Sequence, residues 1–183
     1  YDADRGDFFF LEVNTRLQVE HGVTELVTGI DLVEWMARLA LDADWEMPAT
    51  APLPHGCAIQ ARVYAEDPNH NFRPSCGLLT EASFPEWTRC DGWVVPGSEV
   101  SPFYDPLLAK VMVLAENRGA AVAKLGQALD ETRISGIETN LRYLRGIVRW
   151  QPYLAGGVAM RDMSGFLYQP NTFDVISAGT MTS

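Results

Sequence analysis

The sequence predicts an α+β protein or a mixed sheet with helices. Short apolar or alternating runs predict strands, of which 58–65 and 109–114 are the clearest. Apolar residues three and four apart predict amphipathic helices, as in 120–131. Strands and helices mix along the chain and no internal repeat is found, which favours this class over an all-helical or all-strand protein.

The composition is that of a folded, acidic protein. The chain has 183 residues, 47% of them hydrophobic, which is enough for one sizeable domain or one and a half small ones, with a packed core. Its net charge of −10 argues against nucleic acid and anionic membranes as partners. No apolar run approaches the roughly 18 residues of a membrane-spanning helix. Nor does the beginning of the chain resemble a signal peptide.

The cysteines bear on the cellular compartment of the protein, and the two ends of the chain bear on whether it is a fragment. Cys57, Cys76 and Cys90 are odd in number and match no zinc-binding spacing, so we expect reduced thiols in a cytoplasmic protein. The chain begins at Tyr1 without an initiator Met and stops in mid-pattern at Ser183. We therefore expect a fragment of a larger protein, with part of its chemistry outside this chain.

The stretch Phe8–His21 has the strongest pattern in the sequence. Four apolar residues lead into a segment in which polar side chains occupy every second position: Glu12, Asn14, Arg16, Gln18 and Glu20. In an extended chain these side chains would share one face, so the pattern predicts a strand with a polar face. Such a face could simply be solvated, but an aromatic run typical of a deep strand seldom precedes one.

The polar residues of this stretch suit a site for a cation and an anion. Glu12 and Asn14 offer the oxygen ligands that Mg²⁺ or Mn²⁺ prefers. Arg16 could pair with a small planar oxyanion, and Glu20 could act as a base. Glycine-rich phosphate loops and an H-E-x-x-H motif do not occur in the chain. The residues alone therefore lead to metal-assisted chemistry on an anion and no further.

A helical region follows the polar stretch. Apolar residues recur at helical spacing after His21-Gly22, and Asp31 with Glu34 reads as the capping box of a second helix. That helix has an apolar stripe, which we expect to pack in a core: Leu32, Trp35, Met36, Leu39 and Ala40. The proline-containing segment Asp42–His55 is expected to be a loop or a boundary between subdomains.

The remaining elements are short. Strands are expected at Ala58–Ala65, Leu78–Phe84, Gly92–Val95 and Ala109–Leu114. Helices are expected from about Ala120 to Glu131 and after a cap at Thr139 or Asn140. Within the first strand, Arg62 shares a face with Gln60 and Tyr64, away from the apolar face. Judged from this strand alone, Arg62 is an ordinary surface residue.

Four segments resemble the biotin carboxylase family within the ATP-grasp enzymes. The first, Phe8–Gly29, closely resembles the family signature. The resemblance continues in the family's order through Ala61–Pro68, Val100–Lys110 and Gly136–Asn140, and it spans most of 8–167. It implies the end of an ATP-grasp domain over 1–45 and the biotin carboxylase C-terminal domain, a mainly antiparallel sheet with flanking helices, over 46–168. A linker and the start of a carboxyltransferase-like region would occupy 169–183.

The resemblance implies an ATP-dependent C–N ligase that carboxylates biotin with bicarbonate. Glu12 would be a metal ligand, with Asn14 completing the Mg²⁺ or Mn²⁺ site on ATP. The residues that grip ATP would precede Tyr1, and neither lysine of the chain lies in the Met-Lys-Met setting of a biotin-bearing lysine. The biotin carrier and the carboxyltransferase would thus be other domains of the same enzyme, and this piece alone is expected to be inactive.

The resemblance also assigns roles in the reaction. Arg16 would bind bicarbonate, helped by Gln18 and by the backbone N–H of Val19. Glu20 would be the base that deprotonates bicarbonate for attack on the γ-phosphate of ATP, giving carboxyphosphate. Arg62 would stabilise the enolate-like oxygen of the biotin ureido ring, which reverses the interpretation of Arg62 as an ordinary surface residue. A scaffold that has lost catalysis remains an alternative, but the complete set argues against it.

Three departures from the common family pattern bear on the acceptor. Gly22 stands where most of the family has Pro, and the loop Phe84–Asp91 is shorter than the family loop at a bacterial dimer contact, so the oligomeric state stays open. The tail Thr172–Ser183 resembles the opening of the carboxyltransferase region of urea carboxylases, with Ala178 in place of an expected Pro. Urea is therefore the favoured acceptor, giving allophanate; an acyl-CoA or pyruvate is the alternative.

Overall fold

The structure is a computed structural model that describes residues 2, 5–42, 44–50 and 52–168. The tail Thr172–Ser183, on which the resemblance to urea carboxylases partly depends, lies outside the described residues, as does the whole of 169–183. Within the described part of the chain, no helix combines the length and the apolar composition needed to cross a membrane.

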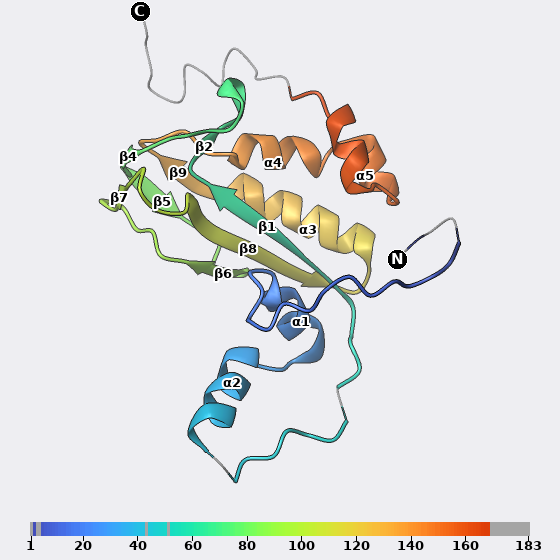
Figure 1. The fold of residues 1–183 in the computed structure, drawn as a ribbon. Helices are drawn as coiled ribbons and strands as arrows, with labels where there is room; N and C mark the ends of the chain where they lie inside the picture. Colours follow the sequence, from blue (N-terminus) through green and yellow to red (C-terminus); the bar gives the residue numbers. More distant parts are fainter. Residues whose placement is uncertain (1, 3–4, 43, 51, 169–183) are drawn as a thin grey trace, which may run out of the picture.

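A three-stranded antiparallel sheet forms the centre of the fold (Figure 1). Its order is β1 (Cys57–Tyr64), β8 (Leu107–Ala115) and β6 (Arg89–Gly92). The strands predicted at 58–65 and 109–114 are thereby confirmed. The strand predicted at Gly92–Val95 is wrong in position, because ladder pairing ends at Gly92. The apolar residue Val94 instead lies buried in a second core cluster.

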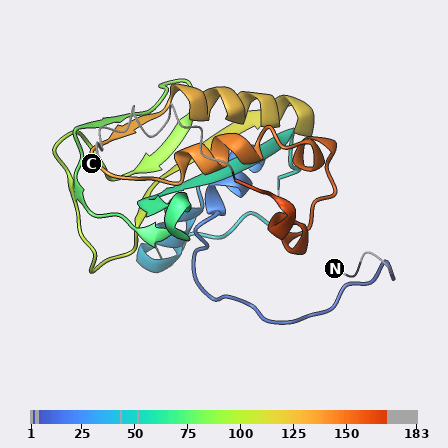
Figure 2. The same ribbon diagram turned by 90° about the horizontal axis from the view of Figure 1, so that it is seen from above.

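Helices α3 (Arg118–Glu131) and α4 (Leu141–Ile147) lie on the same side of the sheet (Figure 2). The main core lies beneath them, and ten residues of it are buried: Ala61, Val63, Val111, Val113, Val122, Leu125, Ala128, Leu129, Leu141 and Val148. Both helices were predicted. α3 begins earlier than expected because Asn117 caps it, accepting a hydrogen bond from the N–H of Ala120 at 3.0 Å. The antiparallel sheet with its flanking helices confirms the α+β class.

Short strands complete the fold at one end of the central sheet (Figure 1). The strand predicted at Leu78–Phe84 is instead two, because the chain changes partner between them: β4 (Gly77–Leu78) pairs with β7 (Glu99–Val100), and β5 (Glu81–Ser83) pairs with β9 (Arg133–Ser135). The remaining elements, in chain order, are β2 (Glu66–Asp67), a 3-10 turn (Pro68–His70), β3 (Arg73–Pro74), β4 (Gly77–Leu78), β5 (Glu81–Ser83), β7 (Glu99–Val100), β9 (Arg133–Ser135), α5 (Gln151–Ala155) and a second 3-10 turn (Met160–Gly165).

Helix α1 (His21–Thr28) covers the opposite face of the central sheet, where Gly22 touches Met112 of β8. The helix ends at Gly29, whose φ of +72° is the left-handed conformation that glycine adopts without cost. Gly22 is buried, and a Cβ added there would overlap Sδ of the fully buried Met112. This close contact is a physical reason for glycine at a position where the family commonly has proline.

Replacing Gly22 with Ala should therefore destabilise the protein by about 1–3 kcal/mol through overpacking. The measurement is the free energy of unfolding of the chain in guanidinium chloride. Gly126 of α3 is the matched control, since a Cβ there would make an ordinary contact with Val148 at 3.7 Å. Gly126→Ala should leave stability unchanged or raise it by up to about 1 kcal/mol.

The same contact can be tested by a double variant. Met112→Ala should relieve the overpacking, so Gly22→Ala should cost less in that background than in the wild type. A Gly22→Ala protein as stable as the wild type, or strictly additive losses in the double variant, would show that the two residues do not compete for space.

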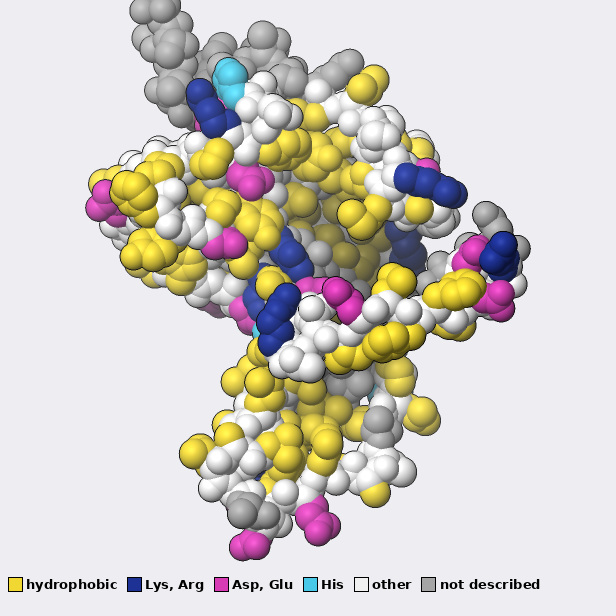
Figure 3. Space-filling view, viewed as in Figure 1, with side chains coloured by type: hydrophobic (Ala, Val, Ile, Leu, Met, Phe, Trp, Pro, Cys, Tyr) yellow, Lys and Arg dark blue, Asp and Glu magenta, His cyan; other side chains and the backbone are white. Residues whose placement is uncertain are grey.

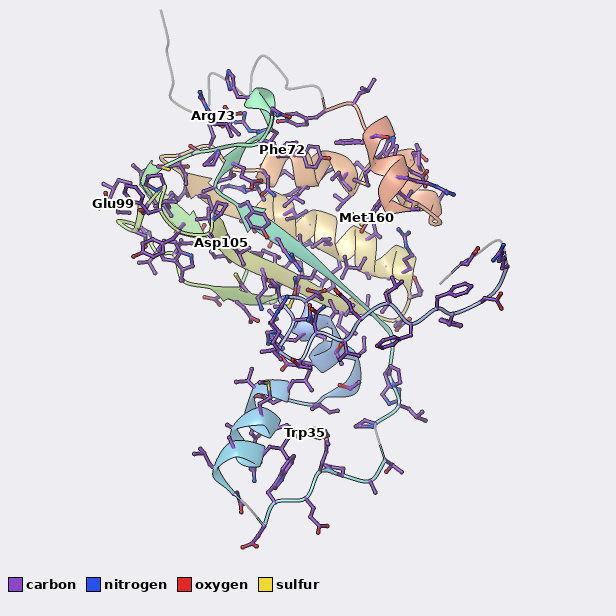
Figure 4. The ribbon with its side chains drawn as sticks, viewed as in Figure 1. Trp35, Phe72, Arg73, Glu99, Asp105 and Met160 are labelled. Atoms are coloured by element: carbon purple, nitrogen blue, oxygen red, sulfur yellow. The ribbon has the colours of Figure 1, made fainter. Side chains whose placement is uncertain are left out.

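Helix α2 (Leu32–Leu41) differs from its prediction. Its predicted N-cap is confirmed, because Asp31 accepts the N–H of Glu34 at 2.8 Å, but Glu34 binds Arg38 at 2.6 Å instead of completing a capping box. The prediction that the apolar stripe of α2 packs in a core is wrong, because none of the described residues of α2 is buried. Trp35 points toward the loop after α2 (Figure 4) and packs edge-on against Trp45. The helix lies beyond α1, away from the sheet (Figure 1).

The stretch 8–18 forms no strand, and residues 19–20 form a turn before α1, which corrects the prediction of a strand over Phe8–His21. A strand needs a ladder partner for its backbone N–H and C=O groups, and none of the described strands pairs with this stretch. Its aromatic run is exposed instead of deep, with Phe8, Phe10 and Leu11 each more than 80% exposed. Hydrophobic side chains lie along this segment and over α2 at the surface (Figure 3).

Candidate functional site

Arg62 lies on the face of β1 that is turned toward α1. The alternation predicted for this strand is correct, since Ala61 and Val63 are buried under α3 while Arg62 is partly exposed on the other face. In the register of the sheet, Arg62 is opposite Lys110 of β8, and Lys110 is opposite Asp91 of β6. Charged residues therefore form one row across the sheet beneath α1.

Glu20 meets Arg62 at this face. Glu20 is the last residue before α1, and its Oε2 lies 2.7 Å from Nη2 of Arg62. The two residues are 42 positions apart in sequence, and the packing of α1 on β1 and β8 brings them together. Their side chains are 54% and 37% exposed, so a small ligand could reach either one.

A pocket of about 280 Å³ lies beside this ion pair. Arg16, Gln18 and Glu20 contribute to its lining, together with residues of α1. The side-chain nitrogen Nε2 of Gln18 is buried and has no hydrogen-bond partner among the described residues. A buried donor without an acceptor is costly, so an acceptor placed beside Gln18 would be favourable. The residues that line the pocket thus include a guanidinium, an amide and a carboxylate.

Not every predicted site residue belongs to this pocket. Val19 lies with Glu20 in the turn before α1 but does not line the pocket, and its side chain is partly exposed. Glu12 and Asn14 are exposed in the segment before α1. They offer one carboxylate and one amide oxygen, which fits a hard cation but leaves most of its coordination to other ligands. No group of three or more His, Cys, Asp or Glu in the described part of the chain could hold a metal.

A partly buried ionic network holds α1 on the sheet, and the sequence did not predict it. Glu25 of α1 is nearly buried and pairs with Nη1 of Arg89 at 2.6 Å. The other carboxylate oxygen of Glu25 accepts the N–H of Leu32 at 2.8 Å, which ties the start of α2 to α1. Arg89 also binds Asp91 through two hydrogen bonds of 3.0 and 3.1 Å, and Lys110 adds a third contact to Asp91 at 3.1 Å.

The pKa values of this network agree with its charges. Burial acts to raise the pKa of Asp91, but hydrogen bonds from Arg89 and Lys110 outweigh burial and hold that pKa below its usual value. The hydrogen bond to Asp91, followed by the one to Glu25, raises the pKa of Arg89 against the opposing effect of burial. In the sequence, only the alternation of Arg89 and Asp91 around Cys90 could have indicated that these two side chains lie on the same face of a strand. The alternation gave no information on their partner Glu25.

The three cysteines are free and have no sign of catalytic use. Cys90 lies next to Asp91 in β6, and burial, followed by the charge of Asp91, raises its pKa to about 11. A thiol with such a pKa is a poor nucleophile at neutral pH, because almost none of it is the thiolate. The expectation of structural cysteines therefore agrees with the geometry.

Taken together, this geometry supports proton abstraction from an anion. Arg16 and the Gln18 amide offer positive charge and a hydrogen-bond donor for an oxyanion. Glu20 lies in the same pocket as a potential base, and Arg62, in contact with the Glu20 carboxylate, supplies a second cation.

The chain is similar to known protein families, to known proteins and to solved structures. The family model described as the biotin carboxylase C-terminal domain matches residues 60–163, and that of the carbamoyl-phosphate synthase L chain, ATP binding domain, matches residues 1–47. The urea amidolyase of Saccharomyces cerevisiae is 45% identical over 183 residues, which are 100% of this chain and 10% of that protein. The chain thus spans about a tenth of the length of this relative.

Two solved structures extend the comparison. The urea carboxylase of Kluyveromyces lactis has a TM-score of 0.88 and 49% identity, covering 93% of this chain and 15% of that one. The biotin carboxylase domain dimer of Hydrogenobacter thermophilus 2-oxoglutarate carboxylase, in complex with MgADP, ADP and bicarbonate, has a TM-score of 0.84 and 34% identity, covering 88% and 36%. Because the C-terminal domain model matches more than half of the chain, the chain belongs to the biotin carboxylase family.

Proposed function

We propose that this chain is part of a biotin-dependent carboxylase that uses ATP and bicarbonate and transfers the carboxyl group to urea, giving allophanate. The observation that carries the proposal is the 2.7 Å contact between Glu20 and Arg62 beside the pocket of Arg16 and Gln18. The amide of Gln18 and the guanidinium of Arg16 suit the planar, oxygen-rich bicarbonate ion.

The first step of the proposed reaction takes place in this pocket. Arg16 and Gln18 hold bicarbonate, with the backbone N–H of Val19 as a further donor. Glu20 removes the bicarbonate proton, and the resulting oxygen attacks the γ-phosphorus of ATP while the bond to ADP breaks, giving carboxyphosphate and ADP. Holding the two reactants in line contributes much of the acceleration. Glu12 and Asn14 would hold Mg²⁺ or Mn²⁺, which neutralises phosphate charge when bound.

The second step uses Arg62. The carboxyl group passes from carboxyphosphate to the ureido nitrogen of biotin, which another domain carries: the bond between the carboxyl carbon and the phosphate oxygen breaks, and phosphate leaves with the proton of that nitrogen. Arg62 places a fixed positive charge where the ureido oxygen becomes negative, and such a charge lowers a barrier by several kcal/mol. Nη2 of Arg62 lies 2.7 Å from Oε2 of Glu20, so the proposed base of the first step and the proposed cation of the second step are neighbours.

The domain boundaries follow from the same proposal. Residues 1–45 would be the end of the ATP-grasp domain, 46–168 the biotin carboxylase C-terminal domain, and 169–183 the start of a following carboxyltransferase-like region. The carrier and the carboxyltransferase would be domains of the same enzyme, and this piece alone would be inactive. Free thiols at Cys57, Cys76 and Cys90 fit a cytoplasmic location.

The choice of acceptor can be tested with the intact enzyme. We expect urea to stimulate ADP release in the presence of ATP, Mg²⁺ and bicarbonate, whereas acetyl-CoA and pyruvate leave it at the basal rate. Omission of bicarbonate is the control, since it should abolish the urea response. Stimulation by an acyl-CoA or by pyruvate, with none by urea, would reject urea as the acceptor and favour the other class of carboxylase.

A further inference from the structure

Asn140, at the start of α4, is hydrogen-bonded to two residues at the end of β1, Arg62 and Tyr64. Its Oδ1 accepts the N–H of Tyr64 at 2.9 Å, and its Nδ2 donates to the carbonyl of Arg62 at 3.1 Å. The backbone N–H of Asn140 donates to the carbonyl of Tyr64 at 3.1 Å. Asn140 is nearly buried, and three hydrogen bonds therefore connect it to the two residues 62 and 64.

These bonds replace a missing neighbour strand. In the described part of the chain β1 is at the edge of its sheet, with β8 on one side only. Backbone groups of alternate strand residues face the same edge, so those of Arg62 and Tyr64 share the edge away from β8. Asn140 satisfies three of these groups, which would otherwise lack ladder partners.

Asn140 gives up an ordinary role to make these contacts. It occupies the N-cap position of α4, where Asn normally binds the N–H groups of its own helix. Its side chain makes no such cap bond, and the N–H of Leu141 is left to Oγ1 of Thr139 at 3.4 Å. The side chain is directed at β1 instead of its own helix.

The hydrogen bonds from Asn140 act on β1 close to an irregularity beside Arg62. The register of β1 against β8 shifts between Val63 and Tyr64, one residue beyond Arg62. Such irregularities disrupt the ladder and re-aim side chains, so the direction of Arg62 depends on what fixes the edge at this point. On the other side of the sheet plane, Arg62 reaches Glu20 at 2.7 Å.

We propose that Asn140 is a positioning residue for Arg62: it fixes the backbone of β1 so that the Arg62 guanidinium lies at the reacting oxygen. The inference rests on the proposed function of Arg62. Asn140 itself touches neither substrate nor cofactor in this proposal. It acts in the second step of the reaction and leaves the chemistry of Glu20, Arg16 and Gln18 in place.

The test uses the intact enzyme, prepared without attached biotin and assayed with and without free biotin. Asn140→Ala removes both side-chain bonds. Asn140→Asp keeps the size and the acceptor for Tyr64, but sets an oxygen against the Arg62 carbonyl. Both should lower kcat for biotin-dependent ADP release roughly ten- to hundredfold, as expected for a misplaced catalytic group. The KM values for ATP and bicarbonate, and the biotin-independent ATP cleavage, should stay near wild type.

Asn117 provides the matched control. It is also an N-cap asparagine, but its side chain makes the ordinary bond to its own helix α3. Asn117→Ala should lower the melting temperature and leave biotin-dependent ADP release unchanged. A loss of rate in Asn117→Ala equal to that in Asn140→Ala would mean that general destabilisation explains both.

A double variant separates this inference from the function on which it rests. Once Arg62 is Ala, adding Asn140→Ala should cause no further loss, since Asn140 acts through Arg62. Multiplicative losses, or a normal rate in Asn140→Ala beside an impaired Arg62→Ala, would overturn the positioning role alone. A normal biotin-dependent rate in Arg62→Ala would overturn the proposed function. If neither Asn140 variant gives folded enzyme, Asn140 serves folding as a whole and the specific role is rejected.

Discussion

Glu20→Gln in the intact enzyme should abolish bicarbonate-dependent ATP cleavage while the protein remains folded. The amide has the size of the carboxylate and its oxygen can still accept the hydrogen bond from Arg62, which is 2.7 Å long in the wild type. It cannot take a proton from bicarbonate, however. Loss of a general base costs roughly 10²- to 10⁴-fold in rate, so cleavage should fall to near the background level.

The measurement is ADP release with and without bicarbonate, together with the melting temperature. Glu20 is more than half exposed, and substitutions at such positions usually change stability by no more than about 0.5 kcal/mol. Glu34→Gln is the control, because Glu34 is an exposed glutamate whose carboxylate binds only Arg38 in the described structure. It should be fully active. A Glu20→Gln enzyme with near-normal bicarbonate-dependent cleavage would remove Glu20 as the base.

The contact between Glu20 and Arg62 shows which part of the site local sequence patterns can predict and which part they cannot. Alternation in β1 correctly predicted the face on which Arg62 lies, because side chains in a strand point alternately to its two sides. That local pattern cannot report which distant segment approaches the face. Arg62 therefore read as an ordinary surface residue until the family resemblance was considered, and the geometry then brought it to Glu20, 42 residues away.

The stretch before α1 shows the opposite failure. Its period-two pattern predicted a strand over Phe8–His21, yet pairing depends on a partner as much as on the pattern. No described strand pairs with it, so the stretch forms no strand. The stripe of α2 failed for the same physical reason, because an apolar face is buried only where another element covers it.

The ionic network beneath α1 could not be predicted from the sequence. Glu25 lies in a helix, and Arg89 and Asp91 lie in a strand 64 and more residues later, so nothing local marks them as one network. The tight contact between Gly22 and Met112 is similar. A glycine in place of proline was visible in the sequence, but its reason depends on which side chain of β8 lies beneath α1.

The second large effect is expected for Arg62→Ala, which should impair biotin carboxylation much more than ATP cleavage. The substitution removes the fixed cation proposed for the ureido oxygen, and loss of one such donor costs roughly 10²- to 10³-fold in rate. Arg16, Gln18 and Glu20 line their pocket from another segment, so they should still bind and deprotonate bicarbonate. The slow biotin-independent ATP cleavage should therefore persist.

Two further variants make this prediction sharper. Arg62→Lys keeps the charge but loses the planar fork of donors, so its biotin-dependent rate should lie between those of Arg62→Ala and wild type. Arg38→Ala, which breaks an exposed ion pair on α2, should change neither reaction. The two rates are measured as ADP release with and without free biotin. Equal loss of both in Arg62→Ala would contradict a role confined to the second step, and would place Arg62 with Glu20 in the first.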